Sequence, residues 1–274
     1  MSSTLAPAWR LLVDPPADGA WNMAVDEVLL ESVVSSRRSP ATLRLYGWQP
    51  AALSLGRSQP AAGAHDPRFL RGEGIDLVRR PTGGGAVLHE HELTYAVTAA
   101  LRGESFPGGV LDTYARIAAA LAGALRAIGV DARAAGPERR RPPRPSGPVC
   151  FEALAAHEIS AGGMKLVGSA QLRRRGAFLQ HGSIPIRSDR ERVARAFGLE
   201  RPPAHYTDLA TVLGRIPPRA GLDRAILRSF EATFGARLEP AELSGPEREA
   251  ATRLRARKYL SAVWTHEGRE PPAR

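Results

Sequence analysis

The chain has little cysteine, little lysine, few aromatic residues and no long apolar run. Its 274 residues include one cysteine, Cys150, which excludes an intrachain disulfide and fits a reducing cytoplasm. No apolar run approaches the roughly 18 residues that span a bilayer, and residues 1–10 have no signal-peptide pattern. We therefore expect a cytoplasmic protein without a membrane partner.

Positive charge, in contrast, is abundant. Lysine and arginine number 38 against 28 acidic residues, and the formal net charge of +10 predicts acidic partners. Nucleic acid is the usual partner of a basic chain, but aromatic residues make up only 6% of this one. No zinc-finger spacing or RNA-binding aromatic signature is present. Composition alone leaves open both an acidic protein partner and a nucleic-acid-binding role.

Arginine carries nearly all of this charge, because the lysines are Lys165 and Lys258 alone. Arginine cannot lose its proton in a protein, whereas a lysine amine can. Lys165 follows the lone cysteine by fifteen residues, so handling the thiol proton of Cys150 is one interpretation of its presence. The other interpretation is that two lysines remain by chance and that Cys150 is a small buried hydrophobe.

Helical and strand-like segments are mixed without regular alternation, which predicts an α+β fold rather than a doubly wound parallel sheet. A proline- and arginine-rich stretch at 137–148 predicts an exposed loop with Cys150 at its exit. The expected helices are an amphipathic one at 19–34, an alanine-rich one at 111–128, and others at 189–197, 222–234 and 245–258. The expected strands are 9–13, 42–48, 51–55, 75–79, 86–89, 93–100, 130–134, 158–161, 165–173 and 177–186.

Three segments have the composition of a ligand site. Residues 79–89 place three glycines between two strands, where backbone can approach a ligand and aim N–H groups at an anion or carbonyl; a flexible turn is the alternative. Residues 162–171 form a tight turn and a strand with Lys165 near its start; a hairpin with a solvated lysine at its tip is the alternative. Residues 178–184 contain His181, and a histidine between polar residues on a strand is more often structural than catalytic. The candidate substrate-binding residues are Arg80, Thr82, Gly83, Gly84, Gly85, His89, Gly168, Ser169, Ala170, His181 and Gly182.

These segments together resemble the biotin/lipoate ligase and transferase superfamily. The resemblance lies in RRPTGGGAVLHEHELTYAV, CFEALAAHEIS and GGMKLVGSAQLRRRGAFLQHGSI, in the first-helix motif at 22–27 and in the segment 256–259. It covers residues 9–265 and implies largely antiparallel sheets flanked by helices. It also implies a single catalytic domain over 1–274, with its core at about 38–248 and a short C-terminal helical extension.

Within the superfamily the pattern is most similar to the LipM-type octanoyltransferases, because Cys150 precedes the Lys-x-x-Gly-Ser-Ala-Gln segment. The resemblance implies transfer of an octanoyl group from octanoyl-acyl carrier protein to a lysine of a lipoyl domain. Acceptors would be proteins such as glycine cleavage H protein or the 2-oxoacid dehydrogenase E2 component. Cys150 would carry the acyl group and Lys165 would promote thiolate formation. No metal, cofactor or nucleic acid is implied.

Two related activities stay open at this point. LipM-type enzymes often have Gly-Gly-Arg where this chain has Gly83, Gly84 and Gly85, and three glycines resemble the ATP-dependent lipoate-protein ligases. A ligase, however, does not need a cysteine. A lipoyl amidotransferase would share the cysteine and lysine. For the octanoyltransferase we expect the acyl chain in a tunnel lined by Val87, Leu88 or their neighbours.

Overall fold

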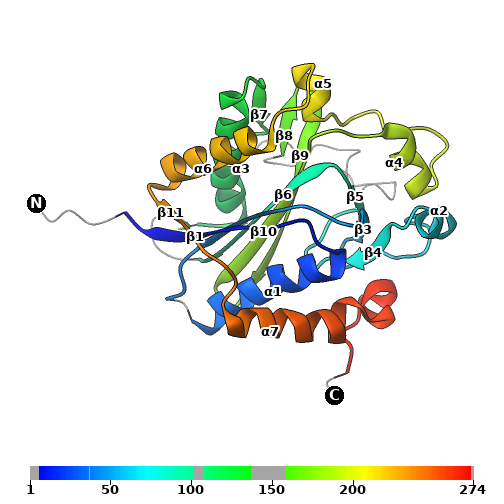
Figure 1. The fold of residues 1–274 in the computed structure, drawn as a ribbon, viewed down its shortest axis with the longest axis horizontal. Helices are drawn as coiled ribbons and strands as arrows, with labels where there is room; N and C mark the ends of the chain where they lie inside the picture. The colour runs from blue at the N-terminus through cyan, green and yellow to red at the C-terminus, as the bar shows by residue number, and fades with distance from the viewer. Residues whose placement is uncertain (1–5, 37, 102–105, 107, 137–157, 273–274) are drawn as a thin grey trace, which may run out of the picture.

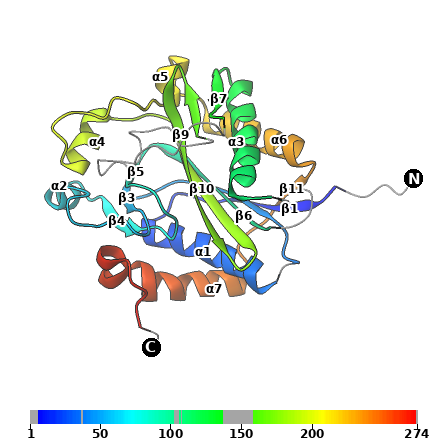
Figure 2. The same cartoon turned by 180° about the vertical axis from the view of Figure 1, so that it is seen from behind.

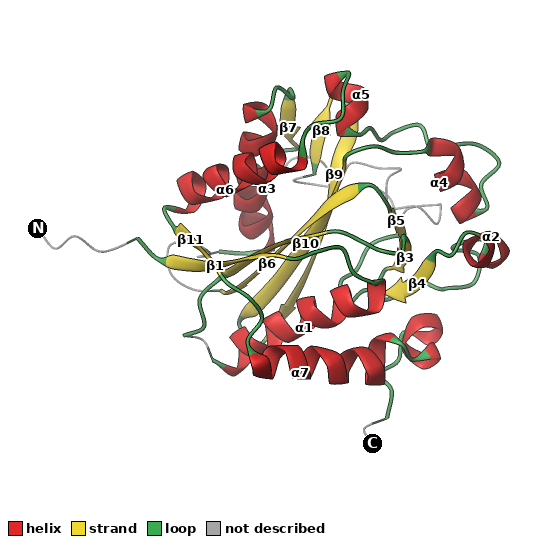
Figure 3. Cartoon of the chain, in the orientation of Figure 1, coloured by secondary structure: helices red, strands yellow, loops and turns green. Residues whose placement is uncertain are grey.

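The computed structural model describes residues 6–36, 38–101, 106, 108–136 and 158–272. Cys150 and the predicted loop at 137–148 lie outside the described residues. The described part contains an eight-stranded sheet and a three-stranded sheet flanked by helices (Figures 1 and 3). The prediction of an α+β fold with mixed, largely antiparallel sheets is therefore confirmed.

The large sheet gathers strands from the whole described chain. Strand β1, next to the edge strand β11, is parallel to both of its neighbours, β11 and β2, and the remaining pairs are antiparallel. Its longest ladder joins β6 to β10, whose side chains are almost all buried. In spatial order the strands are β11 (Arg237–Pro240), β1 (Ala8–Val13), β2 (Thr42–Tyr46), β6 (Glu92–Ala100), β10 (Ala177–Pro185), β9 (Met164–Arg174), β8 (Ile159–Ala161) and β7 (Ala132–Ala134).

The small sheet consists of β4 (Asp76–Arg79), β3 (Ala52–Leu55) and β5 (Val87–His89), with β3 in the middle. β4 and β5 are the two strands that flank the three glycines, as predicted. The strands expected at 42–48 and 51–55 both form, but they belong to different sheets. The chain therefore passes from one sheet to the other between them.

Helices cover both faces of the large sheet (Figures 1 and 2). On one face α1 packs against β6 and β10 and is itself covered by α7, while on the other face α3 and α6 pack against each other. Among the described helices, none combines the length and apolarity needed to cross a bilayer. The helices are α1 (Gly19–Ser35), α2 (Pro67–Gly72), α3 (Val110–Ala127), α4 (Arg190–Phe197), α5 (Leu209–Leu213), α6 (Arg219–Phe234) and α7 (Gly245–Leu254).

The first helix departs from the amphipathic pattern predicted for it. Its N-terminus is capped by Asp18, whose carboxylate accepts from Trp21 N at 2.8 Å. Most of its residues are buried because the sheet lies on one side and α7 on the other. The polar residues Asn22, Asp26 and Glu27 are buried with the apolar ones, so each needs a partner inside the protein.

The C-terminal segment is bonded to the end of β4, just before the glycine-rich turn. The helix expected at 245–258 ends as α7 at Leu254, and π-helical turns follow at Arg255–Tyr259 and Val263–Glu267. Trp264 is fully buried, and its indole N–H donates to Arg79 O at 2.8 Å. Arg79 Nε in turn donates to Trp264 O at 2.9 Å. The first arginine of the RRPTGGG segment is therefore a structural link between β4 and the C-terminal turns.

Candidate active site

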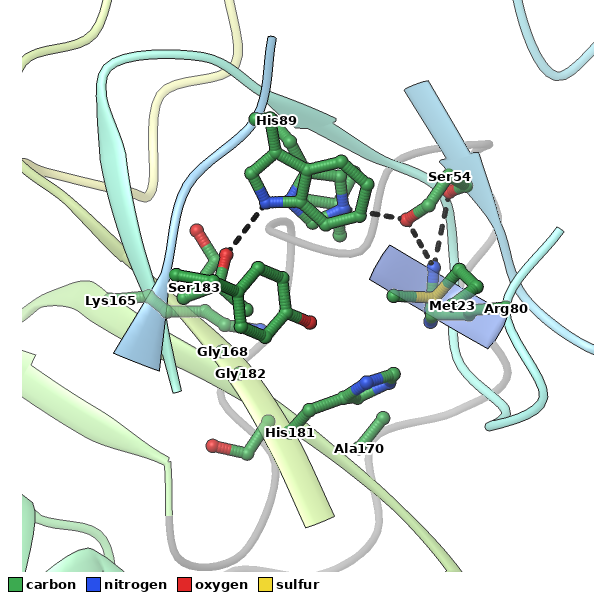
Figure 4. Close-up of a pocket in the computed structure, with 15 residues that line it drawn as sticks. Met23, Ser54, Arg80, His89, Lys165, Gly168, Ala170, His181, Gly182 and Ser183 are labelled. Carbon is green, nitrogen blue, oxygen red and sulfur yellow. Dashed lines mark hydrogen bonds between the residues drawn. The ribbon is translucent and has the colours of Figure 1, made fainter. Parts of the chain in front are cut away.

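A narrow cavity of about 40 Å³ lies where the two sheets and α1 meet (Figure 4). Its walls are contributed by strands of both sheets, so residues far apart in the sequence face one space. The lining residues are Met23 from α1, Tyr46, Trp48, Ser54, Arg80, Val87, His89, Thr94, Lys165, Gly168, Ser169, Ala170, His181, Gly182 and Ser183.

Lys165 stands in the cavity wall near the start of β9, and only 1% of its side chain is exposed. Its Nζ lies 2.5 Å from Oε1 of Glu158, which is also buried. The two residues flank the hairpin turn at Gly162–Gly163, where both glycines have positive φ. The backbone of Lys165 is held from its other side, since its N–H donates to His205 O at 3.0 Å and its carbonyl accepts from Thr207 N at 2.8 Å.

Small residues form the wall beside Lys165. A Cβ added at Gly182 on β10 would lie 2.5 Å from Gly168 O and 2.6 Å from Tyr95 Cε1, so only glycine fits there. The hydroxyl of Tyr95 bonds Ser169 Oγ at 2.7 Å and accepts from Gln180 Nε2 at 3.1 Å. Burial raises the pKa of Tyr95 to about 12, so its hydroxyl stays uncharged near neutral pH.

His89 is held in a chain of buried hydrogen bonds on the opposite wall. Its Nδ1 lies 2.9 Å from Glu92 Oε1, and its Nε2 lies 2.7 Å from Ser54 Oγ. A carboxylate only accepts, so His89 Nδ1 donates to Glu92. The Trp48 indole stacks on the imidazole with 4.0 Å between ring centroids. Burial alone would raise the pKa of Glu92, but its interactions with His89 and neighbouring hydroxyls lower it.

Arg80 connects this chain to the glycine turn. Its NH1 donates to Ser54 Oγ at 3.1 Å, which is drawn in Figure 4, and its NH2 donates to Gly83 O at 2.8 Å and Gly85 O at 2.7 Å. The middle glycine, Gly84, has φ of 96°. One guanidinium therefore fixes the carbonyl groups of a turn that glycine alone adopts easily.

A second buried chain joins α1, β10 and the glycine turn. Asp26 Oδ2 lies 2.9 Å from His181 Nδ1, and His181 Nε2 lies 2.7 Å from Thr82 Oγ1. Asp26 also accepts from Arg44 NH1 at 2.8 Å and from Tyr46 OH at 2.9 Å. Burial lowers the pKa of His181 despite its bond to Asp26, which favours the neutral ring. Burial alone would raise the pKa of Asp26, but His181 and the charge of Arg44 lower it.

The structure brings most of the sequence-predicted residues to one cavity. The four residues Thr82, Gly83, Gly84 and Gly85 do not line it but form the adjoining turn. Val87 lines the cavity, whereas Leu88 lines a separate small pocket, because alternate residues of β5 point to opposite sides. The candidates that do line the cavity are Lys165, Arg80, His89, Gly168, Ser169, Ala170, His181 and Gly182.

Several residues of the site had not been anticipated. Asp26 and Glu92 hold the two histidines, and Glu158 pairs with Lys165. The sequence does carry a signal for Glu158, because it precedes by two residues Ser160, which pairs with Lys165 across the Gly-Gly turn. Asp26 belongs to the first-helix motif at 22–27, but nothing in the sequence links it to His181, which lies 155 positions away. Among the described residues, no three His, Cys, Asp or Glu side chains are grouped as a metal site requires.

The second lysine has a different environment. Lys258 Nζ lies 3.0 Å from Glu27 Oε1 and 2.8 Å from Glu270 Oε1, and it lies 3.8 Å from the Trp264 ring centroid. Tyr259 OH also donates to Glu27. Lys258 thus joins the C-terminal turns to α1, and it is not among the residues that line the cavity.

The sequence of the chain is similar to a known protein family and to curated relatives. The family model of the lipoyl protein ligase A/B catalytic domain matches residues 18–231. Octanoyltransferase LipM of Kyrpidia tusciae is 40% identical over 277 residues, covering 94% of this chain and 98% of the relative. Octanoyltransferase LipM of Symbiobacterium thermophilum is 38% identical over 272 residues, covering 93% and 97%.

The solved structures support the fold. Protein Ta0514 from T. acidophilum with bound lipoic acid superposes on the chain with a TM-score of 0.80 at 23% identity. The match covers 95% of this chain and 99% of that one. The expected biotin/lipoate ligase catalytic fold is therefore confirmed.

Proposed function

The chain belongs to the LipM octanoyltransferases, acyltransferases of the lipoyl protein ligase A/B catalytic family, and on this premise we propose that it transfers octanoyl groups through a thioester on Cys150. The proposed donor is octanoyl-acyl carrier protein. The proposed acceptor is the lysine of a lipoyl domain, as in glycine cleavage H protein or the E2 component of a 2-oxoacid dehydrogenase. The single catalytic domain expected over 1–274 is part of the same proposal.

The position of Lys165 carries this proposal. Of the two lysines in the chain, Lys258 is engaged with Glu27 and Glu270, and Lys165 stands in the cavity wall beside Gly168, Ser169 and Ala170. A lysine amine can give and take a proton, which none of the many arginines can do. The lone cysteine, Cys150, supplies the thiol on which such proton transfer would act.

The first half-reaction forms the acyl-enzyme. A free thiol has a pKa near 8.5 and is only a few per cent thiolate at pH 7, so Cys150 needs activation. The thiol proton passes to Lys165, and the ammonium favours the thiolate. The thiolate attacks the donor's thioester carbonyl, the carbon–sulfur bond to the carrier breaks, and the departing thiolate takes the proton from Lys165. Lys165 is then an uncharged amine.

The second half-reaction regenerates the thiolate. The acceptor amine attacks the Cys150 thioester and forms an amide, and its proton passes to Lys165. The Cys150 thiolate leaves beside the restored Lys165 ammonium. Exchange between thioesters is nearly balanced and amide formation is downhill, so the cycle needs no ATP.

Residues in and around the cavity can stabilise the oxyanion and hold the acyl chain. Backbone N–H groups of the glycine turn, or of the Gly168–Ala170 segment, are the candidates to stabilise the oxyanion. Arg80 holds the turn in shape by binding its carbonyls, and the acyl chain lies between Val87 and the small residues of β9 and β10. The net charge of +10 would attract acidic carrier and lipoyl domains and speed their encounter with the enzyme.

A transfer assay with three donors tests the function. The wild-type protein should octanoylate an apo lipoyl domain from octanoyl-acyl carrier protein without ATP, and Cys150→Ala should not. Modification only from free octanoate plus ATP would identify a lipoate-protein ligase instead. Modification only from an already octanoylated lipoyl protein would identify an amidotransferase.

A further inference from the structure

The ion pair between Glu158 and Lys165 is among the most deeply buried in the described chain. Its Nζ–Oε1 distance is 2.5 Å, and the exposed fractions of the two side chains are 8% and 1%. Taking a carboxylate and an ammonium out of water costs several kcal/mol per ion, so such a pair is weak evidence of a role in stability alone. Lys165 lines the cavity and Glu158 stands behind it, so the pair is placed to act on the chemistry of Lys165.

Backbone hydrogen bonds fix both members of the pair. Glu158 O accepts from Ala135 N at 2.8 Å, which attaches the start of β8 to β7. Lys165 is attached at both its N–H and its carbonyl to the segment 205–207. The register of β8 against β9 shifts between Ile159 and Ser160, a bulge of the kind that re-aims side chains. The local fold therefore holds the carboxylate against the ammonium.

We infer that Glu158 is a positioning residue that holds the ammonium group of Lys165 in place in the wall of the cavity. The inference rests on the proposed function, in which the Lys165 ammonium favours the Cys150 thiolate. An ammonium buried without a counter-charge would favour its neutral form. The Glu158 carboxylate supplies that counter-charge, at 2.5 Å from Lys165 Nζ, to the ammonium beside which the thiolate forms.

Glu158 takes no direct part in the proton transfers of the cycle. It forms no covalent bond and stays a carboxylate throughout, while one proton moves from thiol to Lys165, from Lys165 to the departing carrier thiolate, and from the acceptor amine back to Lys165. Within the described residues, the other titratable or charged groups that face the pair include His205 and Tyr206 on the segment bonded to Lys165, and Tyr46, Arg80, His89 and His181 in the cavity lining.

The rate of alkylation by iodoacetamide tests this coupling, because the chain has one cysteine and the reagent reads the thiolate of Cys150 alone. The variant is Glu158→Gln, which keeps the shape of the side chain and removes its charge. Glu249→Gln is the matched control, since Glu249 is exposed and pairs with Arg253 on the surface of α7. Circular dichroism and thermal unfolding establish that each variant is folded.

At pH 7 Glu158→Gln should be alkylated about tenfold more slowly, the change in thiolate fraction that one pKa unit gives. The two rates should converge above about pH 9.5, where hydroxide removes the thiol proton without help from Lys165. In a Lys165→Met background, Glu158→Gln should have no further effect. Glu249→Gln should match the wild type at every pH.

Two outcomes would overturn the inference. One is equal alkylation of Glu158→Gln and the wild type at pH 7. The other is alkylation of the variant that is slower by the same factor at every pH, which is the result expected from a purely structural change. Should Glu158→Gln not fold, Glu158→Asp gives the same test, with an intermediate rate at pH 7 and convergence at high pH. Alkylation needs no acyl donor. A wild-type protein that fails to transfer octanoyl groups would therefore refute the proposed function and leave this coupling separately measurable.

Discussion

Nε2 of His181 lies 2.7 Å from the hydroxyl oxygen of Thr82, so the glycine-rich turn is bonded directly to the central strand β10. The other ring nitrogen of His181 is held by Asp26 from α1. One buried imidazole thus ties together the turn, the sheet and the first helix, and its protonation state matters for all three.

This bond predicts a pH dependence of stability. Burial lowers the pKa of His181 below the ordinary value of 6.5, so the unfolded chain binds a proton that the folded chain does not. The neutral ring therefore contributes its full stabilisation above pH 6.5, and the free energy of unfolding should fall as the pH drops from 6.5 towards 5. The paired carboxylates Asp26 and Glu92 have lowered pKa values, so their contribution is lost only at more acidic pH.

Urea denaturation from pH 7.5 to 5 measures this slope, with His181→Gln as the comparison. The variant should show a shallower slope, reduced rather than abolished because the pKa of His65 is lowered in the same direction. An unchanged slope in the variant would contradict the assignment of the effect to His181.

Replacement of Lys165 by arginine separates charge from proton transfer. Lys165→Arg keeps a cation beside Glu158 but cannot give up its proton. We expect octanoyl transfer to fall by about 100-fold or more, the scale of general acid–base catalysis, while the thermal midpoint stays near that of the wild type. Wild-type transfer rates in this variant would leave Lys165 a purely electrostatic role.

The close approach of β10 to β9 predicts a strict requirement for glycine at position 182. The Cβ of Gly182→Ala would meet Gly168 O at 2.5 Å, and backbone there has no room to move. We expect a loss of about 1–3 kcal/mol in the free energy of unfolding, together with reduced transfer. Gly221→Ala on α6 is the control, because its Cβ meets nothing within 4 Å and alanine suits a helix. Equal stability of the two variants would count against this packing.

Replacement of the buried Arg44 should lower the free energy of unfolding much more than replacement of an exposed arginine. Arg44→Met leaves Asp26 buried without its guanidinium partner, which should cost about 3–5 kcal/mol. Arg253→Met breaks an exposed pair with Glu249 and should cost about 0–1 kcal/mol. Denaturant titrations of both variants give the comparison, and similar small losses would show that Arg44 is dispensable to the fold.

Local patterns in the sequence predicted most of the secondary structure correctly. The β8–β9 hairpin followed from Gly162-Gly163, and the end of α3 followed from Gly129, which has φ of 98°. Shorter elements such as α2, α5 and β11 were missed, because a few residues carry too little periodicity to stand out. The burial of α1 on most sides was also missed, since it depends on α7, which packs on it from the other end of the chain.

The site was predictable where its residues share a segment and not where they meet across the fold. Lys165, Gly168 and Ala170 lie on one strand, and their common position in the cavity follows from that. The partners of the two histidines could not be predicted in this way, because Asp26 reaches His181 only through the packing of α1 on β10. The position of Lys165 shortly after Cys150 already distinguished it from Lys258 in the sequence, and the structure places Lys165, but not Lys258, among the residues that line the cavity.

Intact-protein mass spectrometry after mixing with octanoyl-acyl carrier protein, without ATP, tests the covalent mechanism most directly. We predict that the wild-type protein gains the mass of one octanoyl group, that peptide mapping places the group on Cys150, and that an apo lipoyl domain removes it. Cys150→Ala should gain no mass and transfer nothing. Substantial octanoyl transfer by Cys150→Ala, or transfer by a wild-type protein that never carries the group, would contradict the account.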